Sequence, residues 1–320
     1  MVPAEEGTPV RRPKVLFQIP ARLAGLRLAR LLEVLNDEQD ADLDEQLIAT
    51  GAVWLDRRRV QDVDQPVAEG QILAIHFPPP GSRSVRVTPA DILYEDDTLL
   101  VLNKPPGVYV TMTPWDAGND LFWAARRFLA ERDGAAPTLH LAHQLDRDTS
   151  GVLLFSKDPR ANAPLQRMFM EHTIHKQYLA LSEGHVGWDS LEVQTGHGRG
   201  GQGLFRVYPL EAVGSTLPGG QVVKSMETRF RVVERFAAAT LVEATPVTGR
   251  THQIRLHLRH LQYPIAGDMR YGGAPELAGV SLSHHLLHAR AMALQHPRTS
   301  LLLRFEAPLP PLFAEVLEKL

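Results

Sequence analysis

The sequence contains no cysteine, which excludes a disulfide framework, a thiolate metal site and a thiol nucleophile. It has no apolar run near the roughly 18 residues of a membrane-spanning helix. Residues 1–13 are polar, charged and proline-containing, so they lack the pattern of a signal peptide and are expected to form a flexible lead-in. These absences predict a cytoplasmic protein.

The composition is that of a globular protein. The chain has 320 residues, of which 44% are hydrophobic and 22% charged. At roughly 150 residues per domain, this length suits one large domain and one small one. A chain of this size can bury about three quarters of its unfolded surface, so it needs no covalent staples.

The net charge of -3 argues mildly against nucleic acid, which proteins bind by neutralising phosphates. The charges are segregated, however. Acidic residues crowd positions 37–45, whereas Arg57, Arg58 and Arg59 are consecutive and the stretch 250–259 is basic. An acidic enzyme with basic working surfaces therefore remains possible.

Residues 14–77 predict a small separate module. Leucines recur at mostly helical intervals over residues 26–35, and a second helix through Leu47 is expected to end at Gly51. Strands are expected at 52–55 and 71–75. Two helices followed by such a hairpin resemble the small RNA-binding module first known from a ribosomal small-subunit protein. The alternative is an ordinary α+β appendage.

The clearest boundary in the chain is Pro78-Pro79-Pro80-Gly81-Ser82. Consecutive prolines cannot continue a helix or a central strand, and they form a stiff, extended spacer. We therefore expect a linker at residues 78–84 and a larger domain at 85–320.

The most informative stretch of the larger domain is His-Gln-Leu-Asp-Arg-Asp-Thr-Ser-Gly, from His143 to Gly151. Its second half has the composition of a turn, and the apolar run Val152 to Phe155 predicts a buried strand directly after it. A carboxylate such as Asp146, on a loop before a rigid strand, is well placed for chemistry. An ordinary polar turn is the simpler interpretation of these residues alone.

A second motif, Gly-Arg-Thr-His-Gln-Ile-Arg-Leu-His, covers Gly249 to His257. Together with Asn103-Lys104-Pro105-Pro106-Gly107 and Lys176-Gln177-Tyr178, the two motifs resemble the RluA-type RNA pseudouridine synthases. The resemblance covers about residues 90–310 in the right order. It implies an α+β pseudouridine-synthase fold, with a mixed, largely antiparallel central sheet and flanking helices.

The resemblance also implies roles for individual residues. Asp146 would be the nucleophile and Arg255 its partner, although Arg255 would otherwise be read as a surface helix arginine. Tyr178 would stack on the target base, whereas a tyrosine in an apolar strand is usually a core residue. Lys104 would contact phosphate or simply end a strand. The full set expected to contact RNA is Arg250, His252, Gln253, Gln144, Arg147, Lys104 and Lys176. Gln144 stands where the family usually has an arginine that enters the space of the flipped nucleotide, so the manner of RNA distortion is open.

Other chemistries are less consistent with the sequence. Histidines at 252, 257 and 260, or at 284, 285 and 288, could mimic metal ligands, but no His-Glu-x-x-His helix is present and no metal is expected. Asp146 and Asp148 are too close in one turn to bracket a sugar bond from opposite sides. The glycine-rich segment 197–203 lacks the residues of a phosphate-binding loop and is expected to be a mobile surface loop.

The sequence thus predicts an enzyme that isomerises uridine to pseudouridine in structured RNA, ribosomal more than transfer RNA. This reaction needs no cofactor, and the resemblance implies a monomer. Two alternatives remain open: a non-catalytic RNA-binding or ribosome-assembly factor, which Gln144 motivates, and a sugar hydrolase that releases uracil.

Overall fold

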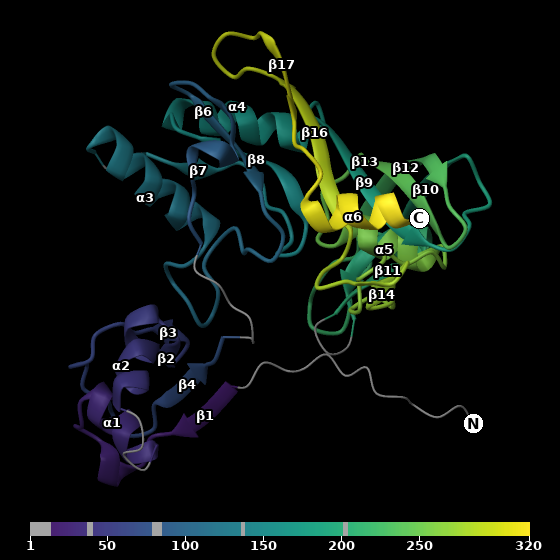
Figure 1. The fold of residues 1–320 in the computed structure, drawn as a ribbon. Coiled ribbons are helices and arrows are strands. Elements are labelled where there is room, and N and C mark those ends of the chain that lie inside the picture. Colours follow the sequence, from purple (N-terminus) through teal and green to yellow (C-terminus); the bar gives the residue numbers. More distant parts are fainter. Residues whose placement is uncertain (1–13, 37–40, 79–84, 136–137, 201–203) are drawn as a thin grey trace, which may run out of the picture. The chain divides into compact units, whose positions relative to one another are not determined.

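The computed structural model describes residues 14–36, 41–78, 85–135, 138–200 and 204–320 (Figure 1). Contacts between Cα atoms divide the chain into two units, which are described separately. The smaller unit comprises residues 1–86 and 111–128, and the larger comprises residues 87–110 and 129–320. The expected flexible lead-in, most of the proline-rich linker and the end of the glycine-rich segment lie outside the described residues.

The smaller unit is a four-stranded antiparallel sheet with two helices. Its elements are β1 (Lys14–Gln18), η1 (Ala21–Leu23), α1 (Leu28–Leu35), α2 (Ala41–Thr50), β2 (Val53–Leu55), β3 (Arg58–Arg59) and β4 (Ile72–His76). The strand order is β1-β4-β2-β3. Alternate strand residues such as Val53, Leu55 and Leu73 are buried, as are Leu31 and Ile48 of the helices. The two predicted helices and the hairpin are therefore present, while the edge strand β1 was not predicted.

Residues 111–128, which the sequence assigns to the larger domain, group instead with the N-terminal residues. The Trp54 indole donates to the carbonyl of Pro114 at 2.8 Å, and the backbone N–H of Ala117 donates to the carbonyl of Thr50 at 2.8 Å. These are side-chain and loop contacts with no sequence periodicity, so no sequence pattern indicates them.

The larger unit is built on one sheet of eleven strands. Its elements are η2 (Pro89–Asp91), β5 (Ile92–Glu95), β6 (Leu99–Lys104), the end of α3 (Leu121–Asp133, of which residues 121–128 belong to the smaller unit), β7 (His140–Leu141), β8 (Ser150–Ser156), α4 (Pro159–Met170), β9 (His175–Glu183), β10 (Ser190–Arg199), β11 (Phe205–Tyr208), η4 (Leu210–Ala212), β12 (Lys224–Arg235), β13 (Ala239–Pro246), α5 (Gln253–His260), β14 (Glu276–Leu277), β15 (Val280–Ser281), β16 (Leu287–Gln295), β17 (Leu302–Glu306) and α6 (Pro311–Lys319). The main strand order is β11-β10-β12-β13-β9-β16-β8-β6-β5, and β16 with β8 is its parallel pair. This sheet confirms the predicted mixed, largely antiparallel α+β fold.

The register of the sheet brings distant motifs into one row. Lys104 pairs with Gly151, Gly151 with Ala289, Ala289 with Tyr178, and Tyr178 with Ala244. Gly151 has a φ of 106°, and a Cβ on it would lie 2.2 Å from the carbonyl oxygen of Ala289. Glycine is therefore required where β8 and β16 approach, five residues after Asp146.

Helices on the sheet position the two motifs. The Asp158 side chain caps α4 by accepting the N–H of Arg160, and Leu165 buries the inner face of this helix against the cluster around β8. Ile254 and Leu258 of α5 are buried against residues of β12 and β13. The N-terminus of α5 is thereby held at the same cavity as Asp146.

The mobile loop predicted for residues 197–203 is in part a strand. His197, Gly198 and Arg199 form the end of β10 and pair with β11, and His197 is 7% exposed. The glycines there fit the close approach of Tyr208 and Leu217, which a Cβ on Gly198 would contact at 3.1 and 2.6 Å. Gly198 thus fits a crowded position of the sheet rather than a mobile loop, and residues 201–203 of the predicted loop lie outside the described residues.

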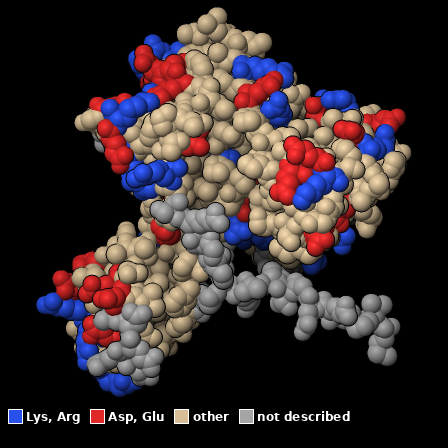
Figure 2. Space-filling view, in the orientation of Figure 1, with Lys and Arg blue, Asp and Glu red and all other residues tan. Residues whose placement is uncertain are grey.

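In the described part of the chain no helix is long and apolar enough to cross a membrane. The face drawn in Figure 2 carries acidic and basic side chains in mixed groups. Pairs such as Arg229 with Glu192 and Arg231 with Glu243, on β10, β12 and β13, are of this kind. Glu243 is half-buried and the other three side chains are exposed, so these pairs contribute little to stability.

Candidate active site

A cavity of 670 Å³ lies where the two motifs meet in the larger unit. Of the ten residues predicted for the site, eight line it: Gln144, Asp146, Lys176, Tyr178, Arg250, His252, Gln253 and Arg255. They come from the loop before β8, from β9 and from the start of α5. Lys104 and Arg147 are not among the lining residues.

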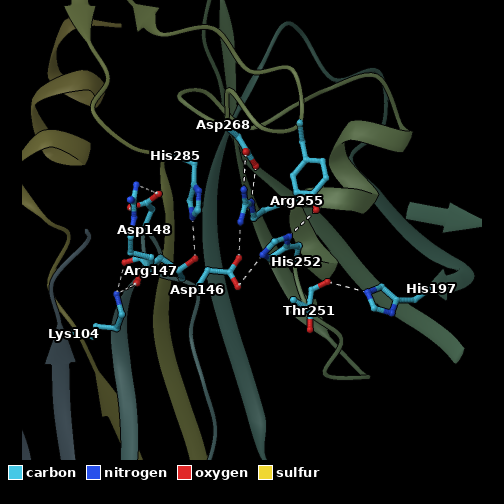
Figure 3. A network of polar contacts seen from close by, with 12 residues as sticks. Lys104, Asp146, Arg147, Asp148, His197, Thr251, His252, Arg255, Asp268 and His285 are labelled. Carbon is cyan, nitrogen blue, oxygen red and sulfur yellow. Dashed lines mark hydrogen bonds and ion pairs between the residues drawn. The ribbon is translucent and has the colours of Figure 1, made fainter. Parts of the chain in front are cut away.

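Asp146 and Arg255 are in direct contact (Figure 3). Arg255 Nη1 donates to Asp146 Oδ2 at 2.8 Å. The Arg255 side chain is 7% exposed and that of Asp146 23%, so the pair sits at the floor of an accessible cavity. The guanidinium carries a permanent positive charge, and its planar N–H donors match the geometry of a carboxylate.

Asp268 binds the two guanidinium nitrogens of Arg255 that do not contact Asp146. It accepts Arg255 Nε at 2.7 Å and Nη2 at 2.8 Å, and its side chain is 1% exposed. Burial lowers the pKa of Arg255, but the hydrogen bonds and charges of Asp268 and Asp146 outweigh burial and raise it. The guanidinium is therefore shared between one buried and one accessible carboxylate. Asp268 is not among the residues that the sequence predicts for the site.

Lys104 holds the loop that carries Asp146 (Figure 3). Its ammonium donates to the carbonyl oxygens of Pro105, Arg147 and Thr149 at 2.9, 2.7 and 2.8 Å, and the residue is 0% exposed. Burial lowers its pKa to about 7, while the charges of Asp148 and Asp146 act to raise it. Lys104 is the last residue of β6, as the strand-end alternative predicts, and its placement does not support a phosphate contact because all three N–H donors are used inside the protein.

Two histidines hold the same loop from the start of β16. His285 Nε2 lies 3.0 Å from the hydroxyl of Thr149, and His288 Nδ1 lies 2.8 Å from that of Ser150. Burial lowers the pKa of His288 to about 4. These histidines were considered as metal ligands in the sequence, and the structure uses them as hydrogen-bonding partners of the loop.

The start of α5 is fixed by Gln253, which is 4% exposed. Its amide donates to the Glu227 carbonyl at 2.7 Å and to Thr228 at 2.9 Å, and its oxygen accepts from Thr248 at 2.7 Å. The predicted RNA contact of Gln253 is thus inconsistent with its placement, because its polar atoms already have internal partners.

His252 lies inside the site, next to Asp146. Its Nδ1 is 2.6 Å from the Tyr271 hydroxyl, and its Nε2 is 3.7 Å from Asp146 Oδ1. Burial lowers its pKa to about 4, and the nearby Asp146 opposes this only partly. His197, stacked on Phe205 at 4.8 Å, bonds the carbonyl of Thr251 and supports this turn.

Tyr178 forms part of the cavity wall in the middle of β9. Its ring is half-buried, and burial together with the charge of Asp146 raises the pKa of its hydroxyl. It therefore remains a neutral aromatic group next to the carboxylate.

The remaining predicted residues lie around the opening. Gln144 is exposed, whereas Lys176 and Arg250 are half-buried, with Arg250 Nε donating to the Ser225 carbonyl at 2.9 Å. Arg147 binds Asp148 at 2.7 Å and lies outside the cavity lining. Among the residues that the structure describes, no three histidine, aspartate or glutamate side chains are grouped for a metal ion.

The chain resembles known proteins in sequence and in fold. The family model described as RNA pseudouridylate synthase matches residues 98–260, a range that contains Asp146, Tyr178 and Arg255. Among solved structures, human RNA pseudouridylate synthase domain containing 4 superimposes with a TM-score of 0.58, covering 72% of this chain and 92% of that one. At 24% sequence identity, this likeness concerns the fold.

Curated relatives are closer in sequence. RNA pseudouridine synthase 1 of Oryza sativa subsp. japonica is 37% identical over 265 residues, which is 72% of this chain and 75% of that protein. Ribosomal large subunit pseudouridine synthase C of Vibrio cholerae serotype O1 is 32% identical over 326 residues, covering 97% of this chain and 98% of that protein. The second likeness therefore includes the N-terminal unit.

Proposed function

The chain belongs to the RluA-type family of RNA pseudouridine synthases, and we propose that it isomerises specific uridines of ribosomal RNA, with Asp146 as the nucleophile. The observation that carries the proposal is the contact of Asp146 with the buried Arg255 at the floor of a 670 Å³ cavity. The ribosomal substrate is supported by the name of the Vibrio cholerae relative, with which likeness extends over nearly the whole chain.

The reaction exchanges one bond for another within a single nucleoside. The bond between the sugar C1′ and uracil N1 breaks, and a bond between C1′ and uracil C5 forms. C5 loses a proton and N1 gains one, so the product is an isomer. No oxidant, reductant or energy donor enters the balance.

A carboxylate suits the first half of this exchange, as it does in retaining glycosidases. Asp146 Oδ1 attacks C1′, and the electron pair of the C1′–N1 bond moves onto the uracil ring. After the ring turns, C5 attacks C1′ and the bond from C1′ to Asp146 breaks. Arg255 holds Oδ2 throughout, so the attacking oxygen keeps its orientation.

The target uridine must reach Asp146 from a folded RNA. Extruding a base costs a few kcal/mol, and stacking on an aromatic side chain recovers about 1–3 kcal/mol per base. We assign the stacking role to Tyr178. For backbone contacts we retain Gln144, Lys176 and Arg250, which line the cavity, and Arg147, which follows Asp146 directly in the chain. We withdraw Lys104 and Gln253.

The N-terminal residues are proposed to add RNA affinity as a separate module, from residue 14 to 77, before the linker at 78–84 and the catalytic domain at 85–320. The exposed basic turn at Arg57 and Arg58 supports this role. The protein is proposed to act as a monomer in the cytoplasm.

The experiment is to incubate the protein with ribosomal and transfer RNA lacking modifications and to map pseudouridine in each. We expect sites in ribosomal RNA, and Asp146→Asn should abolish all of them without unfolding the chain. Asp189→Asn, at a 92% exposed side chain, is the matched control and should be active. Modification of transfer RNA alone would contradict the ribosomal substrate. RNA binding without any isomerisation would favour a non-catalytic factor, and release of free uracil would favour a hydrolase.

A further inference from the structure

The two oxygens of Asp146 face different donors. Oδ2 is bound by Arg255 at 2.8 Å, whereas Oδ1 faces His252 Nε2 at 3.7 Å. The second distance is about 0.5 Å beyond the usual limit of an N–H···O hydrogen bond, near 3.2 Å. Hydrogen bonds at catalytic groups are commonly long before substrate binds and shorten in the reacting complex.

The tautomer of the His252 ring depends on its hydrogen bond with Tyr271. Within the described residues, the only hydrogen-bond partner of the Tyr271 hydroxyl is His252 Nδ1, at 2.6 Å. If that hydroxyl donates, Nδ1 is the acceptor and the single proton of the neutral ring is on Nε2. The Nε2–H then points toward Asp146 (Figure 3).

The ring is also held rigidly. Its side chain is 12% exposed, and the rings of Phe205 and Tyr271 pack edge-on against it at centroid distances of 5.7 and 5.5 Å. His252 has a φ of 58°, a left-handed conformation that costs a non-glycine residue on the order of 1 kcal/mol or more. Such strain is often found at functional sites.

The support of His252 is tied to that of Arg255. Tyr271 follows Asp268 by three residues, and its N–H donates to the Asp268 carbonyl at 2.9 Å. The Arg255 guanidinium carbon lies 4.9 Å from the centre of the Tyr271 ring. One short turn therefore carries both Asp268, which orients Arg255, and Tyr271, which orients His252.

We propose that His252 is a positioning residue for the nucleophile: it donates its Nε2–H to Asp146 Oδ1, while Arg255 binds Oδ2, so that the plane of the carboxylate is fixed on both sides. This inference rests on the proposed function of Asp146. Oδ1 keeps a second lone pair for the attack on C1′. The same donor stabilises the carboxylate when it leaves C1′. A contact of His252 with the RNA backbone, predicted from sequence, fits less well because the ring is neutral and nearly buried.

The test compares two replacements at the same left-handed position, so that their backbone strain cancels. His252→Gln keeps an amide donor at similar reach, whereas His252→Leu removes it. In single-turnover reactions with ribosomal RNA, we expect His252→Leu to lower the rate about 10- to 100-fold, because a misplacement of about 1 Å at a reacting group can cost about 100-fold. His252→Gln should recover most of this loss. The Kd for RNA should change less than about threefold in both, and His260→Ala, at the exposed end of α5, should match the wild type.

A readout independent of activity is the ¹⁵N spectrum of the imidazole. With ¹⁵N-labelled histidine and assignment by His252→Gln, the wild type should show His252 as the Nε2–H tautomer. Tyr271→Phe should convert it to a mixture of tautomers, and Asp146→Asn should shift its Nε2 resonance.

The inference fails if His252→Leu reacts at the wild-type rate, if its loss is confined to Kd, or if the proton is on Nδ1. If the wild type forms no pseudouridine in any RNA, the proposed function fails instead. The response of the His252 resonance to Asp146→Asn still tests the contact in that case.

Discussion

Asp268 binds Arg255 through both carboxylate oxygens: Oδ2 accepts from Nε at 2.7 Å and Oδ1 accepts from Nη2 at 2.8 Å. The side chain of Asp268 is only 1% exposed. This bidentate pair occupies Nε and Nη2 of the guanidinium and leaves Nη1 for Asp146. The direction in which Arg255 presents its charge is thus set by a residue that lies outside the cavity lining.

Asp268→Asn should therefore impair catalysis without removing any group from the cavity. The amide is neutral and has one acceptor oxygen in place of two, so the buried guanidinium loses its counter-charge and one of its two hydrogen bonds to this residue. We expect the single-turnover rate to fall about 10- to 100-fold, because a small misplacement of a reacting group is enough for such a loss. Breaking a buried ion pair should also lower the free energy of unfolding by about 3–5 kcal/mol.

Urea unfolding and pseudouridine formation on ribosomal RNA, measured on the same preparation, check both effects. Glu306→Gln removes an exposed partner of Arg290 and Arg304 and is the matched control for loss of one carboxylate. Wild-type rate and stability in Asp268→Asn would contradict the role assigned to this pair.

Asp268 also illustrates what the sequence predicts and what it does not. The motifs indicate Asp146 and Arg255, 109 positions apart, because each lies in a long and specific pattern. The fold class follows from the same patterns and from short apolar runs that form strands. What joins these residues is the register of β8, β9 and β16, which depends on pairing across the whole sheet. Asp268 and Tyr271 lie in a turn whose sequence reveals no partner.

The role of Lys104 also could not be predicted from local sequence patterns. The sequence suggests a strand-end lysine or a phosphate contact for Lys104. Only the pairing of Lys104 with Gly151, between β6 and β8, shows that its ammonium binds backbone carbonyls of the Asp146 loop. The N-terminal helices Leu28–Leu35 and Ala41–Thr50 were predictable because their patterns are local. Segment 111–128 was not, because its partners are distant in sequence.

Lys104 should make stability depend on alkaline pH. Its pKa is lowered to about 7 in the folded chain, from an ordinary 10.5. Between these values the unfolded chain binds more protons at this site, so the contribution of Lys104 to stability rises with pH, by at most about 1.4 kcal/mol per pH unit. The free energy of unfolding of the wild type minus that of Lys104→Met should therefore increase from pH 7 to pH 9.

The matched control for this slope is Lys319→Met, at a 49% exposed side chain of α6. If the difference in the free energy of unfolding between wild type and variant varied with pH equally for Lys104→Met and Lys319→Met, Lys104 would not have a lowered pKa. Lys104→Met should also slow the reaction, since the carbonyl groups of Arg147 and Thr149 lose their donor and the loop is no longer fixed.

His143 should make the site sensitive to acid. Its Nε2 accepts the backbone N–H of Leu154 at 3.1 Å, and burial lowers its pKa to about 3 from 6.5. Protonation removes this acceptor. The stability contributed by His143 is thus fully present above pH 6.5 and is lost as the pH falls toward 3, at up to about 1.4 kcal/mol per pH unit.

Replacing His143 with glutamine supplies an acceptor oxygen that does not titrate. His143→Gln should therefore flatten the decline in the free energy of unfolding between pH 6.5 and 4, whereas the same change at the exposed His172 should not. Parallel declines in the wild type and in His143→Gln would show that another group controls acid unfolding.

Arg57 and Arg58 test the RNA affinity proposed for the N-terminal module. Both are exposed at the hairpin turn between β2 and β3, where Asp56 and Arg57 adopt left-handed φ values of 47° and 67°. In contrast, Arg59 is half-buried and bound to the carbonyls of Gly51 and Thr113, so it serves the fold of the module. The first two guanidinium groups are available to phosphates.

Replacing Arg57 and Arg58 together with alanine should weaken RNA binding through counterion release. Loss of two phosphate contacts should lower the slope of log Kd against log salt concentration by about 1.5. The single-turnover rate at saturating protein should stay near that of the wild type, because the cavity around Asp146 is unchanged. Filter binding at several salt concentrations measures the slope, with Arg304→Ala on β17 as the control for loss of surface charge. An unchanged slope would show that this turn does not contact RNA. A lost single-turnover rate would mean that the turn is needed for the chemical step as well as for affinity.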